Sequence, residues 1–327
     1  MTVPIASAAP LAATALALTL LLSGCGSNRT AESPSPADTS AKADTTASAA
    51  PGSADACPTA PVDVVVSVDQ WGDIVSELGG ACTNVKTVLA SSSVDPHDYE
   101  PSPADASSFA GAQLVVVNGA DYDHWASDLA ANSAKNAPVI SAAEVTRTAD
   151  GANPHLWYNP AAVTAVADAV TAELSKIDPA AAGYFTERRA AFTATMQPYS
   201  ALSEKIKAGA TGKSYAATES VFDYQAEALG LVNKTPEGYQ RAAANESEPT
   251  PADIEAFRKA LGDKQIDVLI YNTQTEGSIP EQIRAAAEAN GVPVVEVTET
   301  VAPGETTFVS WQDKQLDALA KALGVTP

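Results

Sequence analysis

Short runs of β-branched residues alternate along the chain with longer stretches of helix-forming residues. Several of the longer stretches begin with Pro near their first turn, where its missing N–H is harmless. Alternating strands and helices imply parallel sheets with helices on both faces, so we expect an α/β fold. The expected strands are residues 62–68, 85–90, 113–118, 137–140, 214–218, 268–271 and 292–298, and the clearest helices are 70–78, 161–177, 251–261 and 280–290.

The strands fall into two sets on either side of residue 180, which predicts two lobes, each with its own parallel sheet. The segment 179–208 between them is rich in Ala, Glu, Arg, Lys and Leu and is expected to be one long linking helix. Pro198 lies inside this segment and should kink or break it. We therefore expect an N-terminal lobe at 57–178 and a C-terminal lobe at 209–327.

The N-terminus is expected to be a targeting segment. Residues 11–22 are small and apolar, too few for a stable membrane span but typical of a secretory signal. Leu-Ser-Gly-Cys at 22–25 follows and resembles a bacterial lipobox, which implies a signal peptide at 1–24 and lipidation of Cys25; the alternative is an ordinary signal with a chance Cys. Residues 26–56 lack large apolar side chains and are expected to form a flexible tether. These features predict a protein anchored on the extracytoplasmic face of the cell membrane.

If Cys25 is lipidated, Cys57 and Cys82 remain, and an exported chain with two such residues suggests one disulfide. Each precedes an expected strand, so the two would lie at the same sheet edge if those strands are parallel neighbours. The alternative is two free buried thiols.

Composition and motifs narrow the function. The 40 acidic against 19 basic residues give a formal charge of -21, which opposes binding to nucleic acid or anionic lipid and favours cationic partners. The G-x-S-x-G, H-E-x-x-H, P-loop and G-x-G-x-x-G motifs are absent from the sequence. We therefore do not expect an enzyme.

Two of the three histidines lie in rigid loops of the form Pro-His-x-aromatic, His97 in Asp-Pro-His-Asp-Tyr and His155 in Asn-Pro-His-Leu-Trp. His124 has no such frame and is expected to be a surface residue. In the C-terminal lobe, Glu219 and Glu299 follow expected strands, at the edge where parallel α/β sheets bind ligands. Two imidazoles and two carboxylates would neutralise a divalent cation. The alternatives are solvated histidines and glutamates that stabilise helix N-termini.

These segments resemble the metal-binding lipoproteins of zinc or manganese ABC importers, the cluster A-I solute-binding proteins. The resemblance covers about residues 60–325 and is carried by the motifs at 95–101, 153–160 and 217–224, with a further similar segment at 246–249. It implies two α/β lobes joined by one long helix and a single Mn²⁺ or Zn²⁺ held by His97, His155, Glu219 and Glu299. It also implies an ABC permease as partner, and we expect a monomer.

Three departures from the family pattern bear on the metal. Asn153 and Asn159 stand where Asp is usual, Glu299 is longer than the usual Asp, and residues 121–137 hold only His124 in place of a His-rich loop. Two glutamates and no His-rich loop favour manganese slightly, although the general affinity order favours zinc. Other hypotheses are a metal-dependent adhesin on the same fold and a zinc hydrolase, which would need an open coordination position and a general base.

Overall fold

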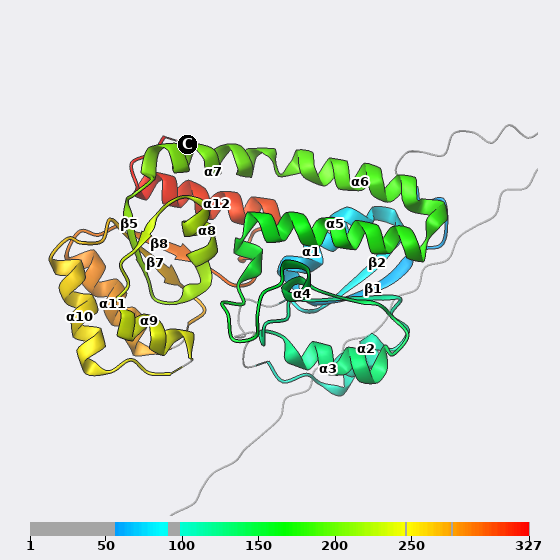
Figure 1. Ribbon diagram of the computed structural model, residues 1–327, viewed down its shortest axis with the longest axis horizontal. Helices are drawn as coiled ribbons and strands as arrows, with labels where there is room; N and C mark the ends of the chain where they lie inside the picture. The colour runs from blue at the N-terminus through cyan, green and yellow to red at the C-terminus, as the bar shows by residue number, and fades with distance from the viewer. Residues whose placement is uncertain (1–55, 91–98, 246, 276, 327) are drawn as a thin grey trace, which may run out of the picture. The chain divides into compact units, whose positions relative to one another are not determined.

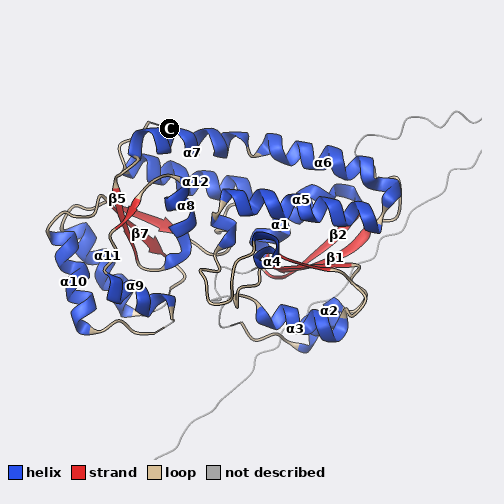
Figure 2. Cartoon of the chain, viewed as in Figure 1, coloured by secondary structure: helices blue, strands red, loops and turns tan. Residues whose placement is uncertain are grey.

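The structure is a computed structural model that describes residues 56–90, 99–245, 247–275 and 277–326 (Figure 1). The expected signal peptide, Cys25, the tether and His97 lie outside the described residues. Both lobes belong to one compact unit of the chain. Strands and helices alternate through the described part, as the pattern of apolar runs predicted (Figure 2).

The N-terminal lobe is built on a four-stranded parallel sheet with the order β2-β1-β3-β4. Its two central strands are buried except at Asp63, which explains why they are rich in Val and do not alternate apolar with polar residues. The strands are β1 (Val62–Val68), β2 (Thr83–Leu89), β3 (Leu114–Val117) and β4 (Val139–Ser141). The helices of this lobe are α1 (Asp69–Gly79), α2 (Pro103–Phe109), α3 (His124–Ser133), α4 (Ala142–Thr146) and α5 (Pro160–Ile177).

The C-terminal lobe repeats this arrangement with the order β6-β5-β7-β8, again all parallel. Each expected strand is present with its ends moved by a residue or two. The additional strand β6 was not predicted, because it has only two residues and Val232 is exposed. The strands are β5 (Ser214–Ala217), β6 (Val232–Asn233), β7 (Val268–Asn272) and β8 (Val294–Val297). The helices are α8 (Asp223–Ala228), α9 (Glu237–Ala244), α10 (Pro251–Gly262), α11 (Ser278–Ala289) and α12 (Phe308–Ala322).

The expected linking helix consists of two consecutive segments, α6 (Ala182–Thr195) and α7 (Gln197–Ala210), which run between the lobes in Figure 1. The break falls just before Pro198, which lies in the first turn of α7, where it removes no helical hydrogen bond. The predicted interruption is thus confirmed. Among the described residues, no helix has both the length and the apolar character needed to cross a bilayer.

The two lobes share one hydrophobic core that includes buried residues of both sheets. Tyr158, in the 3₁₀ turn before α5, belongs to this core. Its ring makes edge contacts with Phe222 and Trp311 of the C-terminal lobe, with centroids 5.4 and 5.8 Å away. Its hydroxyl oxygen lies 2.7 Å from the carbonyl oxygen of Thr298 and 2.7 Å from Gln315 Oε1, and its single proton is shared between these two acceptors. This packing fixes the loop that carries His155 against the strand end that carries Glu299.

A disulfide joins Cys57 and Cys82, whose Cα atoms are 4.9 Å apart. The parallel pairing of the two strands explains why the cysteines meet. β1 and β2 are parallel neighbours with Val62 opposite Thr83, so the residues just before the two strands meet at one edge of the sheet. The alternative of two free thiols is therefore wrong for this structure.

Candidate metal centre

His155 is the N-terminal lobe's described donor and lies between α4 and α5, immediately before a single 3₁₀ turn at Leu156–Tyr158. Its side chain is buried. Asn153 Oδ1 lies 2.7 Å from His155 Nδ1 and also accepts from the His155 backbone N–H at 3.0 Å. Because an amide oxygen only accepts, Nδ1 carries the proton and Nε2 is the ring atom available to a ligand.

The backbone of the His155 loop is held by the end of a neighbouring strand. Asn118, just after β3, donates from Nδ2 to the carbonyl of Pro154 at 2.9 Å, and its Oδ1 accepts from Trp71 Nε1 at 2.9 Å. From the other lobe, Tyr224 donates its hydroxyl to the carbonyl of Asn153 at 2.8 Å. The loop is therefore fixed from both lobes.

Glu219 and Glu299 follow β5 and β8, as the strand pattern predicted. Glu219 precedes a 3₁₀ turn at Ser220–Phe222 but makes no side-chain capping hydrogen bond there, and the next helix after Glu299 begins at Phe308. Neither carboxylate therefore makes a capping hydrogen bond at the start of the next helical segment. Glu299 is 1% exposed, so its carboxylate is withdrawn from water and needs partners within the protein.

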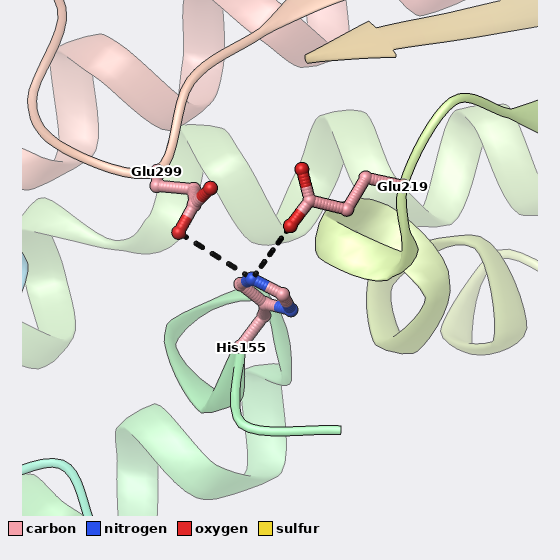
Figure 3. Close-up of side chains that lie close together, drawn as sticks. All are labelled: His155, Glu219 and Glu299. Carbon is pink, nitrogen blue, oxygen red and sulfur yellow. Dashed lines mark ion pairs between the residues drawn. The ribbon is translucent and has the colours of Figure 1, made fainter. Parts of the chain in front are cut away.

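The three side chains converge on one point, with one potential ligand atom from each lying within 4.8 Å of the others (Figure 3). His155 Nε2 lies 3.5 Å from Glu299 Oε2 and 3.8 Å from Glu219 Oε1. One imidazole nitrogen and two carboxylate oxygens at this spacing form a donor set suited to a divalent transition metal. Among the residues that the structure describes, no other group of this kind is present.

Each carboxylate also accepts hydrogen bonds from residues that the sequence reasoning missed. Asn272 Nδ2 donates to Glu219 Oε2 at 2.8 Å and to Glu299 Oε1 at 2.9 Å. Thr275 donates its hydroxyl to Glu219 Oε2, and Tyr122 donates to Glu299 Oε2 at 3.2 Å. Asn272 and Thr275 follow the apolar run 268–271, so their position at a strand end was the one signal that could have indicated them.

The electrostatics of the site are dominated by the carboxylates. Burial lowers the pKa of His155, but Glu299, Glu219 and Asp223 outweigh it and raise that pKa above its ordinary value. Burial, with Glu299 beside it, holds the pKa of Tyr122 well above its ordinary range, so its hydroxyl stays a neutral donor. The site favours positive charge, whether a proton on His155 or a metal ion.

The remaining predicted residues lie elsewhere. His97 is outside the described residues. His124 is the exposed first residue of α3 and is not part of the cluster, as expected. Asn159 is the N-cap of α5, where Oδ1 accepts from the backbone N–H groups of Ala161 and Ala162. Of the two asparagines that stand where the family usually has Asp, only Asn153 therefore contacts a predicted ligand.

Comparisons with known proteins agree with the fold and place the chain in a family. The family model described as "ZnuA: Zinc-uptake complex component A periplasmic" matches residues 64–322, and the chain belongs to this family. Its members are metal-uptake components and not enzymes, as the sequence analysis expected.

Relatives and solved structures resemble the chain at low identity. The chain is 20% identical over 259 residues to the high-affinity zinc uptake system protein ZnuA of Bacillus subtilis, which covers 72% of this chain and 80% of that protein. It is 26% identical to the manganese-binding lipoprotein MntA of Halalkalibacterium halodurans over 139 residues, 41% of this chain and 46% of the relative. The periplasmic zinc-binding protein TroA of Treponema pallidum superposes with a TM-score of 0.67 at 19% identity, covering 80% of this chain and 99% of that structure. This last likeness shows the shared fold.

Proposed function

We propose that this protein captures one divalent metal ion, Mn²⁺ or Zn²⁺, between its lobes and delivers it to the permease of an ABC importer. The proposed ligands are His97, His155, Glu219 and Glu299, and the proposed membrane anchor is a lipid on Cys25. The observation that carries this proposal is the convergence of His155, from a loop of the N-terminal lobe, with Glu219 and Glu299, from two strand ends of the C-terminal lobe. Family membership supports the transport role.

The charge of the donor set supports a divalent ion as cargo. Two carboxylates and neutral imidazoles neutralise a 2+ charge, and this balance lowers the cost of removing the ion from water. Without an ion, the buried carboxylate of Glu299 and the partly buried carboxylate of Glu219 both lie beside the imidazole of His155. A metal ion relieves this excess of negative charge, which provides a large part of its binding free energy.

The position of the ligands between lobes supports a receptor role. An ion that bridges His155 and the two glutamates links the N-terminal lobe to the C-terminal lobe. Beside the site, Asp69 and Asp73 of α1 accept from the backbone N–H groups of Val301 and Phe308, at 3.2 and 2.6 Å. The bound ion therefore adds to an existing interface whose arrangement a permease could sense as loaded or empty.

Calorimetric titration of zinc and manganese into the soluble domain tests the ligand set. We expect one site, with Ala at each of His97, His155, Glu219 and Glu299 weakening affinity by about 100-fold or more, since a lost ligand leaves the others poorly paired. His124→Ala is the matched control and should bind as wild type does. Wild-type affinity in Glu299→Ala, or loss of binding in His124→Ala, would contradict the proposed site.

Membrane fractionation tests the proposed anchor. Cys25→Ser should release the protein from membranes or block its processing, because the acyl group supplies the attachment. A Cys25→Ser variant that fractionates with membranes at mature size would show that the lipobox assignment is wrong.

A further inference from the structure

Glu299 belongs to the C-terminal lobe, yet the chain that follows it is held by a helix of the N-terminal lobe. Three polar side chains in the first two turns of α1 make this contact, directly or through Tyr122, and are here called the α1 latch: Asp69, Gln70 and Asp73. We propose that the α1 latch positions Glu299 for metal binding, so that the affinity for the ion depends on contacts made outside the ligand set. This inference rests on the proposed function.

The segment 298–307 joins β8 to α12 and contains neither strand nor helix. Its own lobe holds it only near its beginning. Asn272 Nδ2 donates to the carboxylate of Glu299, and Gln274 Oε1 accepts from the backbone N–H groups of Glu299 and Thr300, at 2.8 and 3.0 Å. The course of the rest of the segment, and with it the direction of the chain that carries Glu299, depends on the contacts that follow.

The α1 latch holds the backbone of this segment at two points. Asp69 Oδ2 accepts from the backbone N–H of Val301 at 3.2 Å, and Asp73 Oδ2 accepts from that of Phe308 at 2.6 Å. Asp69 and Asp73 are four residues apart on α1 and therefore lie on one face of the helix. Their two contacts bracket the segment, from two residues after Glu299 to the first residue of α12.

Asp73 completes the N-terminus of α12 from the other lobe. Thr307, the N-cap residue, accepts from the backbone N–H of Ser310, and the first N–H of the helix, that of Phe308, takes Asp73 as its acceptor. The helix dipole also favours a carboxylate in this place. Because Phe308 is buried, removing the Asp73 carboxylate takes the acceptor from a donor inside the protein, which is costly.

Gln70 reaches the carboxylate of Glu299 through Tyr122. Gln70 Nε2 donates to the hydroxyl oxygen of Tyr122 at 3.3 Å, and that hydroxyl donates to Glu299 Oε2 at 3.2 Å. All three side chains are buried, so the hydrogen bonds are shielded from water. The α1 latch therefore restrains both the carboxylate of this proposed ligand and the backbone that follows it.

These contacts couple metal binding to the contact between the lobes. An ion would join Glu299 to His155 of the N-terminal lobe, and the α1 latch joins the segment after Glu299 to the same lobe. Both restrain one stretch of chain against one lobe, so forming either reduces the conformational freedom that the other must remove. By linkage, the factor that the α1 latch adds to the metal affinity is the factor that the ion adds to the latch.

The test measures Zn²⁺ affinity in Asp69→Ala and Asp73→Ala and in the conservative variants Asp69→Asn and Asp73→Asn. Each Ala variant should bind Zn²⁺ about fivefold to tenfold more weakly than wild type. Each Asn variant should bind within about twofold of wild type, because an amide oxygen still accepts from the backbone N–H. Ser76→Ala, which removes a side-chain hydrogen bond within α1, is the control and should bind as wild type does.

Amide hydrogen exchange gives a second readout that a general loss of stability would not reproduce. In wild type, saturating Zn²⁺ should slow exchange at Val301 and Phe308, the two donors to the α1 latch. In Asp73→Ala the slowing by Zn²⁺ at Phe308 should be lost, because the ion can no longer strengthen that contact. Asp73→Asn should retain it.

The outcomes separate the two claims. If wild type binds no Zn²⁺ at one ion per chain, the proposed function is wrong. If it binds one ion but the folded Ala variants match wild type, the latch is overturned and the function stands. Equal losses in the Ala and Asn variants would show a general effect of negative charge and would also overturn the latch. If the Ala variants fail to fold by circular dichroism, wild-type exchange decides, and rates at Val301 and Phe308 that Zn²⁺ leaves unchanged overturn the latch.

Discussion

The two lobes have the same sheet order, yet an asparagine at the equivalent strand end performs a different task in each. Asn118 follows β3 and holds the carbonyl of Pro154, so it fixes the backbone that presents His155. Asn272 ends β7 and holds the carboxylates of Glu219 and Glu299. β3 and β7 each lie one strand away from the sheet edge, beside the point where the strand order reverses.

The difference follows from the chemistry of the proposed ligands. An imidazole has one atom that can bind the metal once Nδ1 is paired, so fixing its loop is enough to fix its geometry. A carboxylate has two equivalent oxygens, and fixing its backbone leaves open whether one or both bind. The C-terminal lobe therefore restrains side chains directly, whereas the N-terminal lobe restrains the chain that carries the ligand.

The largest expected effect concerns the disulfide, and among the described residues only the N-terminal lobe has one. Replacing both Cys57 and Cys82 with Ala should lower the free energy of unfolding by about 3–4 kcal/mol, because the closed loop spans a sequence separation of 25. Urea unfolding with and without reductant measures this. Wild type should lose the same amount on reduction, and the double variant should be insensitive to reductant; a wild-type curve that reductant leaves unchanged would refute the disulfide's contribution.

Asn118→Ala should lower the free energy of unfolding by about 2–3 kcal/mol, because the buried Trp71 Nε1 loses its acceptor and the carbonyl of Pro154 loses its donor. Metal affinity should fall less than in His155→Ala, since the ligand itself remains. Chemical denaturation and zinc titration measure the two effects. Asn132→Ala is the control: it removes one exposed hydrogen bond within α3 and should change stability and zinc affinity little. Equal losses in Asn118→Ala and Asn132→Ala would show that Asn118 has no special role.

The contact between lobes at Asp69 should depend on pH. Burial raises the pKa of Asp69 from 3.8 to about 7, so its favourable contribution to folding is complete below about pH 4 and is lost as the pH rises through about 7. Asp69→Asn removes this loss. The free energy of unfolding of the variant, relative to that of wild type, should therefore be about 2 kcal/mol higher at pH 8 than at pH 5. Unfolding at both pH values checks this, with the exposed Asp128→Asn as control. A relative stability that does not change with pH would contradict the prediction.

The sequence predicted more of the fold than of the hydrogen bonds within the candidate site. The two sheets, the break near Pro198 and the nearness of Glu219 to Glu299 followed from apolar runs and strand ends, because parallel sheets place those ends at one edge. His155 was indicated by its Pro-His-x-aromatic loop and by the family resemblance instead. Asn272, Gln274 and Thr275 did not, because polar residues after a strand are common and only their hydrogen bonds distinguish them. Tyr122 was missed for a related reason: its contact with Glu299 spans two lobes, and no local pattern reports such a pairing.

The smallest expected effect is that of Tyr122→Phe. The variant keeps the ring that packs on Trp157, with centroids 4.8 Å apart, but loses the hydroxyl that donates to Glu299 Oε2. Zinc affinity should fall by about threefold to tenfold, which corresponds to the net free energy of about 1 kcal/mol for one typical hydrogen bond. Titration of zinc measures it, and a change as large as that of Glu299→Ala would mean that Tyr122 is itself a ligand.

The most direct test of the central claim is a crystal structure of the zinc-loaded protein, with the ion located by its anomalous scattering. We predict a single ion about 2.0–2.2 Å from His155 Nε2, Glu219 Oε1 and Glu299 Oε2, with His97 as the fourth ligand and Asn272 still bonded to the other oxygen of each glutamate. An ion bound at another place, such as beside His124, or held by residues of one lobe alone would contradict the account.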